Sequence, residues 1–475
     1  MSARALSLLC ALSLSACAMV GEDWRRPSAE PPVRWSQPAL NPPGPAAPSD
    51  EATALDFWRN WDDPTLLALI ERALAHNRDL RQAAARVQEA RALAGEARAQ
   101  ALPQVDAVAS VARDRASGND RMPLGALANP VRQYRQGFDA SWEVDLFGRL
   151  ARQREAAVAQ AEASEFSRDA MALRLAAETA SVYLHMRAAQ AHAAVREQQS
   201  AIAAEAEAVV ASRVRAGLNP ELDRLRAQDQ RAQIDAELPQ ARAEVGLAIR
   251  QLGVLTGGQA DSLLNELAAV APLARQAPPL PRRFPAAWLD RRPDVRAAEA
   301  QLHAAQAQVG VAEGDRLPRL SFAAQFGWLS LTAGRLGDAD SRMFHVGPQL
   351  SLPLFHGGAL SARLDAARAR HDQALLAWDN AVAQAVLDVE TAALREHAAR
   401  QRHAARQRQL ASREQQVELA RLRFTRGLVD YTEPLEALRQ WFAAQAEEIQ
   451  AREEALNHAL ALYKALGGGW RGAPE

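Results

Sequence analysis

The sequence is poor in aromatic side chains and has no excess of either charge. Phe, Trp and Tyr make up 5% of the 475 residues, although 48% of the residues are hydrophobic, and alanine supplies a large share of that fraction. Alanine buries little surface, so this composition favours long helices packed in thin layers over thick globular cores. The 56 basic and 57 acidic residues nearly balance, so no basic excess points to a nucleic-acid partner.

Cysteines, long apolar runs and catalytic motifs are nearly absent. The two cysteines, Cys10 and Cys17, lie at the N-terminus, which leaves the rest of the chain without a disulfide or a thiolate metal site. Beyond Cys17 no stretch reaches the roughly 18 apolar residues that a transmembrane helix needs. The sequence has no nucleophile elbow, Walker loop or dinucleotide fingerprint, so we expect neither an enzyme nor a bound metal or cofactor.

The first residues have the pattern of an export signal that ends at a lipid attachment site. Residues 1–16 combine a short positive start with an apolar segment, and Leu14–Cys17 resembles a bacterial lipobox. In that motif the cysteine becomes the acylated N-terminus after cleavage, so Cys17 is the predicted lipidation site. Residues 17–60 are then a lipidated, extended tail that is rich in proline. A plain signal peptide cut elsewhere is the alternative.

The rest of the chain has the pattern of two copies of one unit. Matching residues recur at a single offset of about 215 positions, which chance rarely produces. The pairs are Asp79 and Asp294, Arg81 and Arg296, Gly95 and Gly310, Leu102 and Leu317, and Pro103 and Pro318. We therefore predict repeat 1 over 61–258, a linker or equatorial segment over 259–290, and repeat 2 over 291–470. Coincidence in an alanine-rich sequence is the alternative.

Each repeat is predicted to contain two strands, a long helix and a returning helix. The long helices carry two apolar seams at coiled-coil spacing, which suits one stave of a closed tube with water inside and outside. A four-helix bundle uses similar faces, so the periodicity alone leaves both architectures open. The predicted strands are about 104–114, 133–147, 319–331 and 343–355, the long helices about 149–216 and 359–426, and the return helices about 221–253 and 432–466.

The strand segments alternate between apolar and polar residues, which is the pattern of transmembrane barrel strands. An ordinary half-buried hairpin of a soluble sheet is the alternative for any one strand. Four strands cannot close a barrel, so spanning a membrane requires several copies, and three copies give about twelve strands. The side chains expected to face lipid are Phe138, Trp142, Val144, Leu146, Phe322, Phe326 and Trp328.

Four separated stretches resemble the TolC-like outer-membrane efflux family, the outer-membrane factors, and specifically its lipoprotein branch. They are Val20–Pro27, Ala140–Arg149, Arg291–Glu299 and Leu462–Trp470, and they occur in the family's order. The resemblance implies a mainly α fold with a transmembrane β-barrel: a homotrimer whose twelve-stranded barrel lies in the outer membrane of a Gram-negative bacterium and continues into a periplasmic helical tube. It also implies docking to a periplasmic adaptor and an inner-membrane RND-type pump, and export of drugs or other small molecules.

The resemblance further implies a gate at the periplasmic tip, where the long helices turn into the return helices. Glu433 and Glu436 match the acidic positions of that gate, and three copies would make a negative ring that favours cations. Thr432 stands where a bulky aliphatic constriction is usual. In repeat 1 the equivalent positions hold Asp223 and Arg226, so the ring is either acidic or paired. Solvated charges at helix starts are the alternative reading of all four.

Three other functions remain open from the sequence. A conduit for type I protein secretion uses the same kind of channel and is the main alternative. A structural coiled-coil lipoprotein of the periplasm would not need the alternating aromatic strands. A periplasmic adaptor would need lipoyl-like and small barrel segments, which the sequence does not offer.

Overall fold

A computed structural model describes residues 19–28, 34–36, 56–115, 130–258, 260–278, 289, 291–429 and 432–468. The chain forms two compact units. The strand unit contains Met1–Ser28, Arg86–Ser164 and Ala297–Trp378, and the hairpin unit contains Ala29–Ala85, Glu165–Arg296 and Asp379–Glu475. Each unit therefore takes segments from both predicted repeats. The predicted signal segment 1–16 and Cys17 lie outside the described residues.

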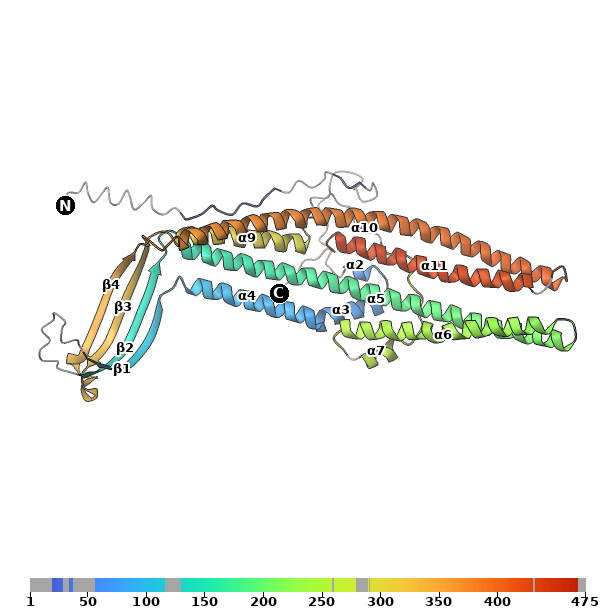
Figure 1. Cartoon of the computed structure of the whole chain (residues 1–475), viewed down its shortest axis with the longest axis horizontal. Helices are drawn as coiled ribbons and strands as arrows, with labels where there is room; N and C mark the ends of the chain where they lie inside the picture. The colour runs from blue at the N-terminus through green and yellow to red at the C-terminus, as the bar shows by residue number, and fades with distance from the viewer. Residues whose placement is uncertain are drawn as a thin grey trace. The chain divides into compact units, whose positions relative to one another are not determined.

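The strand unit contains a four-stranded antiparallel sheet in the order β1-β2-β3-β4, as Figure 1 shows. The strands are β1 (Gln104–Asp114), β2 (Val131–Val144), β3 (Arg319–Ser330) and β4 (Arg342–Ser351). β1 has the expected bounds, but β2 ends before Leu146 and β4 ends before Phe355, contrary to the predicted ranges. Pro353, the second residue after β4, has no amide hydrogen to donate to β3, although this edge strand accommodates Pro348 within the ladder.

The helices of the strand unit pack through small side chains. α4 (Arg78–Ala99) and α9 (Pro293–Gly314) lie mostly in this unit, together with the first parts of α5 (Arg149–Arg215) and α10 (Ala359–Thr425). α9 packs on α10 through a small cluster of Ala312, Leu364 and Ala367. Among the described residues, no helix is long and apolar enough to cross a membrane.

The N-terminal segment Met19–Ser28 is held on the strand unit by a buried arginine. The Arg152 side chain, 2% exposed, donates to the carbonyl oxygen of Val20 at 2.8 Å and to the Asp23 carboxylate at 2.7 Å. Trp24 stacks on the ring of His303, which hydrogen-bonds Glu155. Burial opposes ionisation of Glu155, but its bonds with His303 and Arg152 outweigh burial and lower its pKa.

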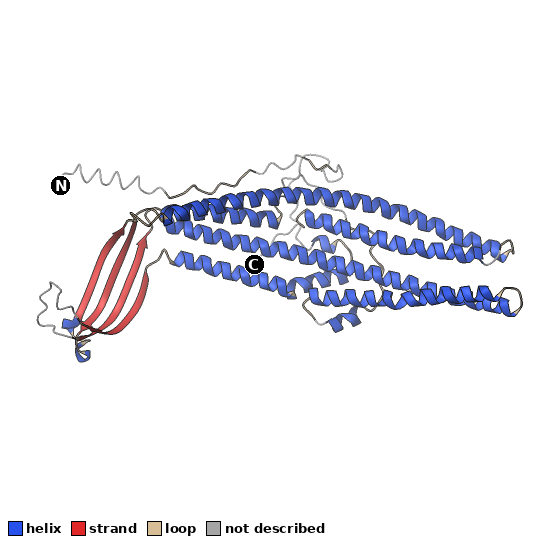
Figure 2. Cartoon of the chain, in the orientation of Figure 1, coloured by secondary structure: helices blue, strands red, loops and turns tan. Residues whose placement is uncertain are grey.

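The hairpin unit contains the largest hydrophobic core and two long helical hairpins. α5 returns as α6 (Glu221–Leu255), and α10 returns as α11 (Thr432–Ala465). Outside the sheet, the regular elements that Figure 2 draws are helices. The core joins α3 (Pro64–His76), α5, α6 and α11 with three short segments of the chain.

Two of these segments, and Trp35 in a separate small cluster, were not expected as ordered structure. α2 (Asp56–Arg59) lies inside the predicted extended tail and supplies Phe57 and Trp58 to the core, where Phe57 stacks on Tyr463. α7 (Ala260–Leu267) lies inside the predicted linker. Trp35, also in the tail, is 3% exposed and packs against Val389 and Leu462. For α2 and Trp35, the aromatic residues themselves were the available signal, whereas α7 contains none.

Both halves of the chain use the same joint where a return helix ends and a short helix begins. In the first half, the Asn77 amide donates to the carbonyl oxygen of Leu255 at 2.9 Å. In the second half, the Arg292 guanidinium donates to the carbonyl oxygen of Ala465, also at 2.9 Å. Asn77 and Arg292 are related by the offset of about 215 residues that defines the sequence repeat.

Candidate functional site

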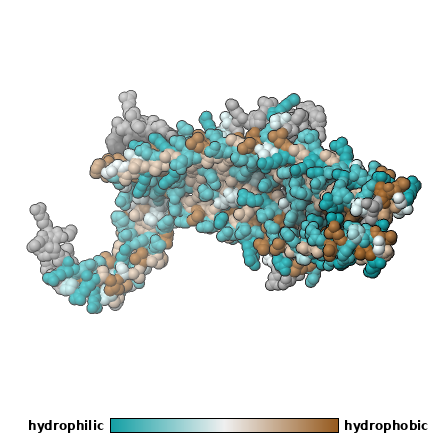
Figure 3. Space-filling model, turned by 45° about the vertical axis from the view of Figure 1, so that its right-hand side comes forward, coloured by the Kyte–Doolittle hydropathy of each residue, from teal (hydrophilic) through white to brown (hydrophobic). Residues whose placement is uncertain are grey.

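The sheet has one apolar face that is largely exposed. The strand register places Phe138, Phe326 and Phe344 in one row across β2, β3 and β4, and places Trp142 beside Phe322. In an antiparallel pair, residues directly opposite each other point to the same face. Phe344 is 80% exposed and Phe326 54%. Hydrophobic residues are visible on the surface of the strand-bearing part of Figure 3.

The predicted lipid-facing residues fall on this face with one exception. Val144 closes β2 on the same side, and Trp328 is half-buried with an indole N–H that has no hydrogen-bond partner among the described residues. Leu146 lies beyond the end of β2, so the alternation does not place it on the sheet. The predicted set lacks the residues that the edge strands contribute to this face, although the same period-two pattern marks them: Val105, Val111, Phe344, Val346 and Leu350.

The opposite face of the sheet is polar. Asp139, Gln325 and His345 form one row across the strands, and Glu143 lies opposite Ser321. Arg135 forms an ion pair with Asp139 on this face. The sheet can therefore meet hydrocarbon on one side and water on the other.

Both edges of the sheet end in a strand without a neighbour in the described part of the chain. β1 pairs only with β2, and β4 pairs only with β3. Each outer strand presents a row of backbone N–H and C=O groups that another strand can pair with. The sheet is therefore incomplete as a single copy within a membrane, where unpaired backbone groups cost several kcal/mol each.

The α10–α11 hairpin holds both predicted gate glutamates in ion pairs. Glu433 pairs with Arg423 across the turn, and Glu436 accepts from Arg439 at 3.0 Å. Hydrogen bonds from Gln440 and Arg439 lower the pKa of Glu436. Each acidic charge thus has a basic partner on its own hairpin.

The predicted gate residues do not all come together. Thr432, Glu433 and Glu436 line a cavity of about 720 Å³ that α11 forms with α5 and α6. Asp223 and Arg226 are not among its lining residues. They pair with each other at 3.6 Å near the α5–α6 turn, where Asn219 also donates to Asp223 at 3.0 Å.

The chain is similar to outer-membrane efflux proteins over nearly its whole length. Residues 69–258 and 285–468 match the family model described as outer membrane efflux protein. The solvent efflux pump outer membrane protein SrpC of Pseudomonas putida is 30% identical over 477 residues, with 99% of each chain covered. The outer membrane protein OprJ of Pseudomonas aeruginosa is 30% identical over 480 residues, which cover 98% of this chain and 95% of OprJ.

Solved structures give the same result for the fold. The outer-membrane channel OprN superposes on the chain with a TM-score of 0.82 and 32% identity, covering 95% of this chain and 99% of OprN. The MtrE outer membrane channel of Neisseria gonorrhoeae superposes with a TM-score of 0.80 and 25% identity, covering 95% and 98%. Together with the family match, these likenesses show that the chain belongs to the outer membrane efflux protein family.

Proposed function

We propose that the chain is the outer-membrane channel of a tripartite efflux system and passively conducts drugs or other small molecules out of a Gram-negative cell. The observation that carries this proposal is the sheet, which is apolar on one face, polar on the other and open at both edges. A membrane pore needs these three properties, because lipid contacts one face, water contacts the other and neighbouring copies cover the edges.

Three copies make the assembly that fits this sheet. Two copies would supply about eight strands, which enclose an interior filled by side chains, whereas three supply about twelve and leave room for water. The row of Phe138, Phe326 and Phe344 would then continue around the outside of the barrel. Cys17 would carry the lipid that adds a second anchor in the same membrane.

The partners that we propose are a periplasmic adaptor and an inner-membrane pump of the RND type. A passive channel has no energy source of its own, so uphill export has to be driven elsewhere. SrpC and TtgI are named as outer membrane proteins of a solvent and a toluene efflux pump, respectively. The α5–α6 and α10–α11 turns are the ends of the hairpins, and we assign adaptor docking to them.

A deletion strain tests the proposed function. Restoring the wild-type gene should raise tolerance to toluene and to uncharged drugs, and outer-membrane extracts should contain trimers that resist dissociation below boiling. An empty vector is the control. Unchanged tolerance together with a monomeric chain would refute the channel assignment.

We also propose that Thr432, Glu433 and Glu436 line the gate, with a weaker cation preference than an unpaired acidic ring would give. Arg423 and Arg439 compensate the two carboxylates, so removing the arginines should increase cation selectivity, whereas Glu433→Gln with Glu436→Gln should reduce it. Single-channel recording of reversal potentials in a salt gradient measures both changes.

Asp223→Asn is the matched control for the gate experiment, because Asp223 is acidic, lies near a hairpin turn and does not line the cavity of Glu433 and Glu436. Equal selectivity in all variants would refute the gate assignment. An effect of Asp223→Asn as large as that of the double glutamine variant would place the selective ring at the other hairpin.

A further inference from the structure

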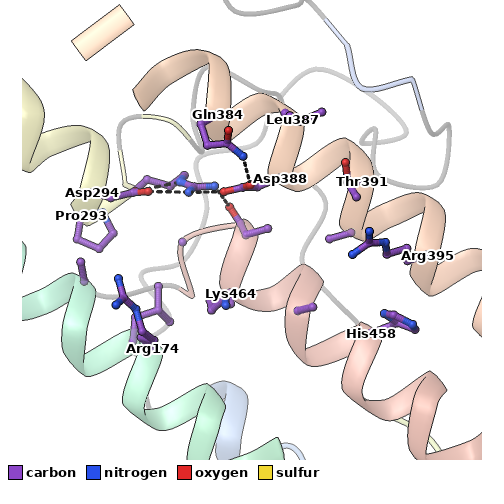
Figure 4. A pocket seen from close by; sticks show the side chains of 17 residues that line it. Arg174, Pro293, Asp294, Gln384, Leu387, Asp388, Thr391, Arg395, His458 and Lys464 are labelled. Carbon is purple, nitrogen blue, oxygen red and sulfur yellow. Dashed lines mark hydrogen bonds and ion pairs between the residues drawn. The ribbon is translucent and has the colours of Figure 1, made fainter. Parts of the chain in front are cut away.

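A second cavity opens in the hairpin unit, at the joint between α11 and α9. Its volume is about 550 Å³, within the usual range for sites that bind small molecules. Side chains from α5, α10 and α11 surround it, together with Arg292, Pro293 and Asp294 at the start of α9, as Figure 4 shows.

Arg292 forms ion pairs with both carboxylates that line this cavity. Its guanidinium is 8% exposed, bonds Asp294 at 2.6 Å and Asp388 at 3.0 Å, and also donates to the carbonyl oxygen of Ala465. Gln384 donates to the second oxygen of Asp388 at 2.7 Å. Both carboxylates are therefore committed to partners within the fold.

Three further cations line the same cavity without such partners. Arg174, Arg395 and Lys464 have exposed side chains, and none of them forms an ion pair or a hydrogen bond with the described part of the chain. Most arginines of the hairpins do pair, as Arg406 does with Glu447 at 2.6 Å. Lys464 is the only lysine of the sequence. The cavity thus holds more positive charge than its own carboxylates neutralise.

The joint itself does not require this charge. The end of α6 in the first half corresponds to the end of α11 in the second half at an offset of about 210 residues, as the glycines that follow the two helices, Gly257 and Gly467, show. At that offset, Lys464 corresponds to Val254 and the cavity-lining His458 corresponds to Ala248. The first-half joint forms with uncharged residues at these two positions, so the fold of the joint does not require Lys464 or His458.

The cavity also has an apolar part and lies on an open side of α10. Leu173 and Leu387 line it, and Leu387 is 56% exposed. Trp35 packs on α10 in a cluster with Val389, and this cluster also contains Ala392, which lines the cavity. Trp35 therefore borders the cavity, whose open side is marked by the exposed Leu387.

From these observations we infer that the cavity binds an amphipathic organic anion, whose carboxylate, sulfonate or phosphate group contacts Arg174, Arg395 and Lys464 while its apolar part rests on Leu173 and Leu387. This inference rests on the proposed channel function, since the anion would be cargo that passes through the lumen. A purely inorganic anion would use the same cations but would gain nothing from the apolar side chains.

The test compares three probes on the full-length chain reconstituted in lipid nanodiscs. Isothermal titration calorimetry would measure naphthalene-1-sulfonate, its uncharged isostere naphthalene-1-sulfonamide, and sulfate. Naphthalene-1-sulfonate should bind more tightly than either of the others. Lys464→Val, which installs the residue of the first half, and Arg395→Gln should each weaken its binding at least about tenfold, since each removes a charge-assisted hydrogen bond to the sulfonate.

The control variant is Arg408→Gln, an exposed arginine of α10 that does not line the cavity. Equal binding of the sulfonamide, equal binding of sulfate, or an equal loss in Arg408→Gln would overturn the inference, provided that the variants keep the oligomeric state of the wild type. Toluene tolerance of cells carrying the wild-type chain tests the channel function separately. A chain that binds the sulfonate but confers no tolerance and stays monomeric would refute the channel and leave the site intact.

Discussion

Replacing Gly257 by alanine should destabilise the chain through two separable effects. Gly257 follows the end of α6 with φ at +67°, a conformation that costs an L side chain about 1–2 kcal/mol. A Cβ at this position would also overlap the carbonyl oxygen of His76, a backbone atom that cannot rotate away. Forcing the joint apart adds about 1–3 kcal/mol, the usual cost of overpacking. The expected total is about 2–5 kcal/mol.

Gly217, in the turn between α5 and α6, provides the matched comparison. Its φ of +70° is nearly the same, but a Cβ there would meet no atom within 4 Å. Gly217→Ala should therefore cost only the conformational part, about 1–2 kcal/mol. The difference between the two variants isolates the contact between the end of α6 and the residue before Asn77.

Thermal unfolding of the purified chains in one detergent, at one scan rate, measures this difference as apparent melting temperatures. Gly257→Ala should lower the melting temperature about 1.5 to 4 times as much as Gly217→Ala, which is the ratio of the two expected costs. Equal shifts would refute the reasoning, because they would mean that the joint relaxes at no cost. A larger shift for Gly217→Ala would show that the hairpin turn limits stability instead.

Three further outcomes are expected. Burial would raise the pKa of Asp294, but its hydrogen bonds and ion pair with Arg292 outweigh burial and lower the pKa. The stabilisation from this carboxylate is therefore present above a pH of about 4 and is lost as the pH falls through the lowered pKa. Asp294→Asn should make the melting temperature depend less on pH in this acidic range. Phe344→Arg should cost about 2–4 kcal/mol if its face meets lipid and should reduce the trimer recovered from outer membranes, whereas His345→Arg on the polar face should not. Arg152→Met should release the Met19–Ser28 segment, seen as faster proteolysis there, and an unchanged cleavage rate would contradict its role as a clamp.

The sequence was sufficient for the strands and long helices because their periodicity is strong and local. β1 and the start of α5 fall where the pattern predicts them. The predicted end of β4 lies beyond the observed Ser351 because the apolar Leu352 and Leu354 extend the alternation past the paired residues. The alternation of apolar and polar residues predicts which face of the sheet a side chain lies on, but it does not predict whether the backbone at that position is hydrogen-bonded to a neighbouring strand.

Long-range partners could not be predicted from one sequence. The ion pair of Glu433 with Arg423 depends on the geometry of the turn, and the carbonyl oxygens that Arg292 caps lie 93 and 173 positions away along the chain. Trp35 packs on a helix more than 350 residues further on, as the neighbouring hydrogen bond from Ser36 to Glu390 illustrates. Such contacts depend on the fold as a whole, and no short window of residues contains both partners.

The two open edges of the sheet also set the kinetics of biogenesis. A newly exported chain carries outer strands of 11 and 10 residues that have no partner until other copies arrive. Closing the proposed ring of three is a multimolecular step, so its rate falls steeply as the concentration of free chains falls, while every free chain stays exposed to wrong strand pairing. Slow synthesis would therefore favour loss of the chain to proteases, very fast synthesis would favour aggregates, and only an intermediate rate, or a chaperone that caps the edges, would give efficient assembly.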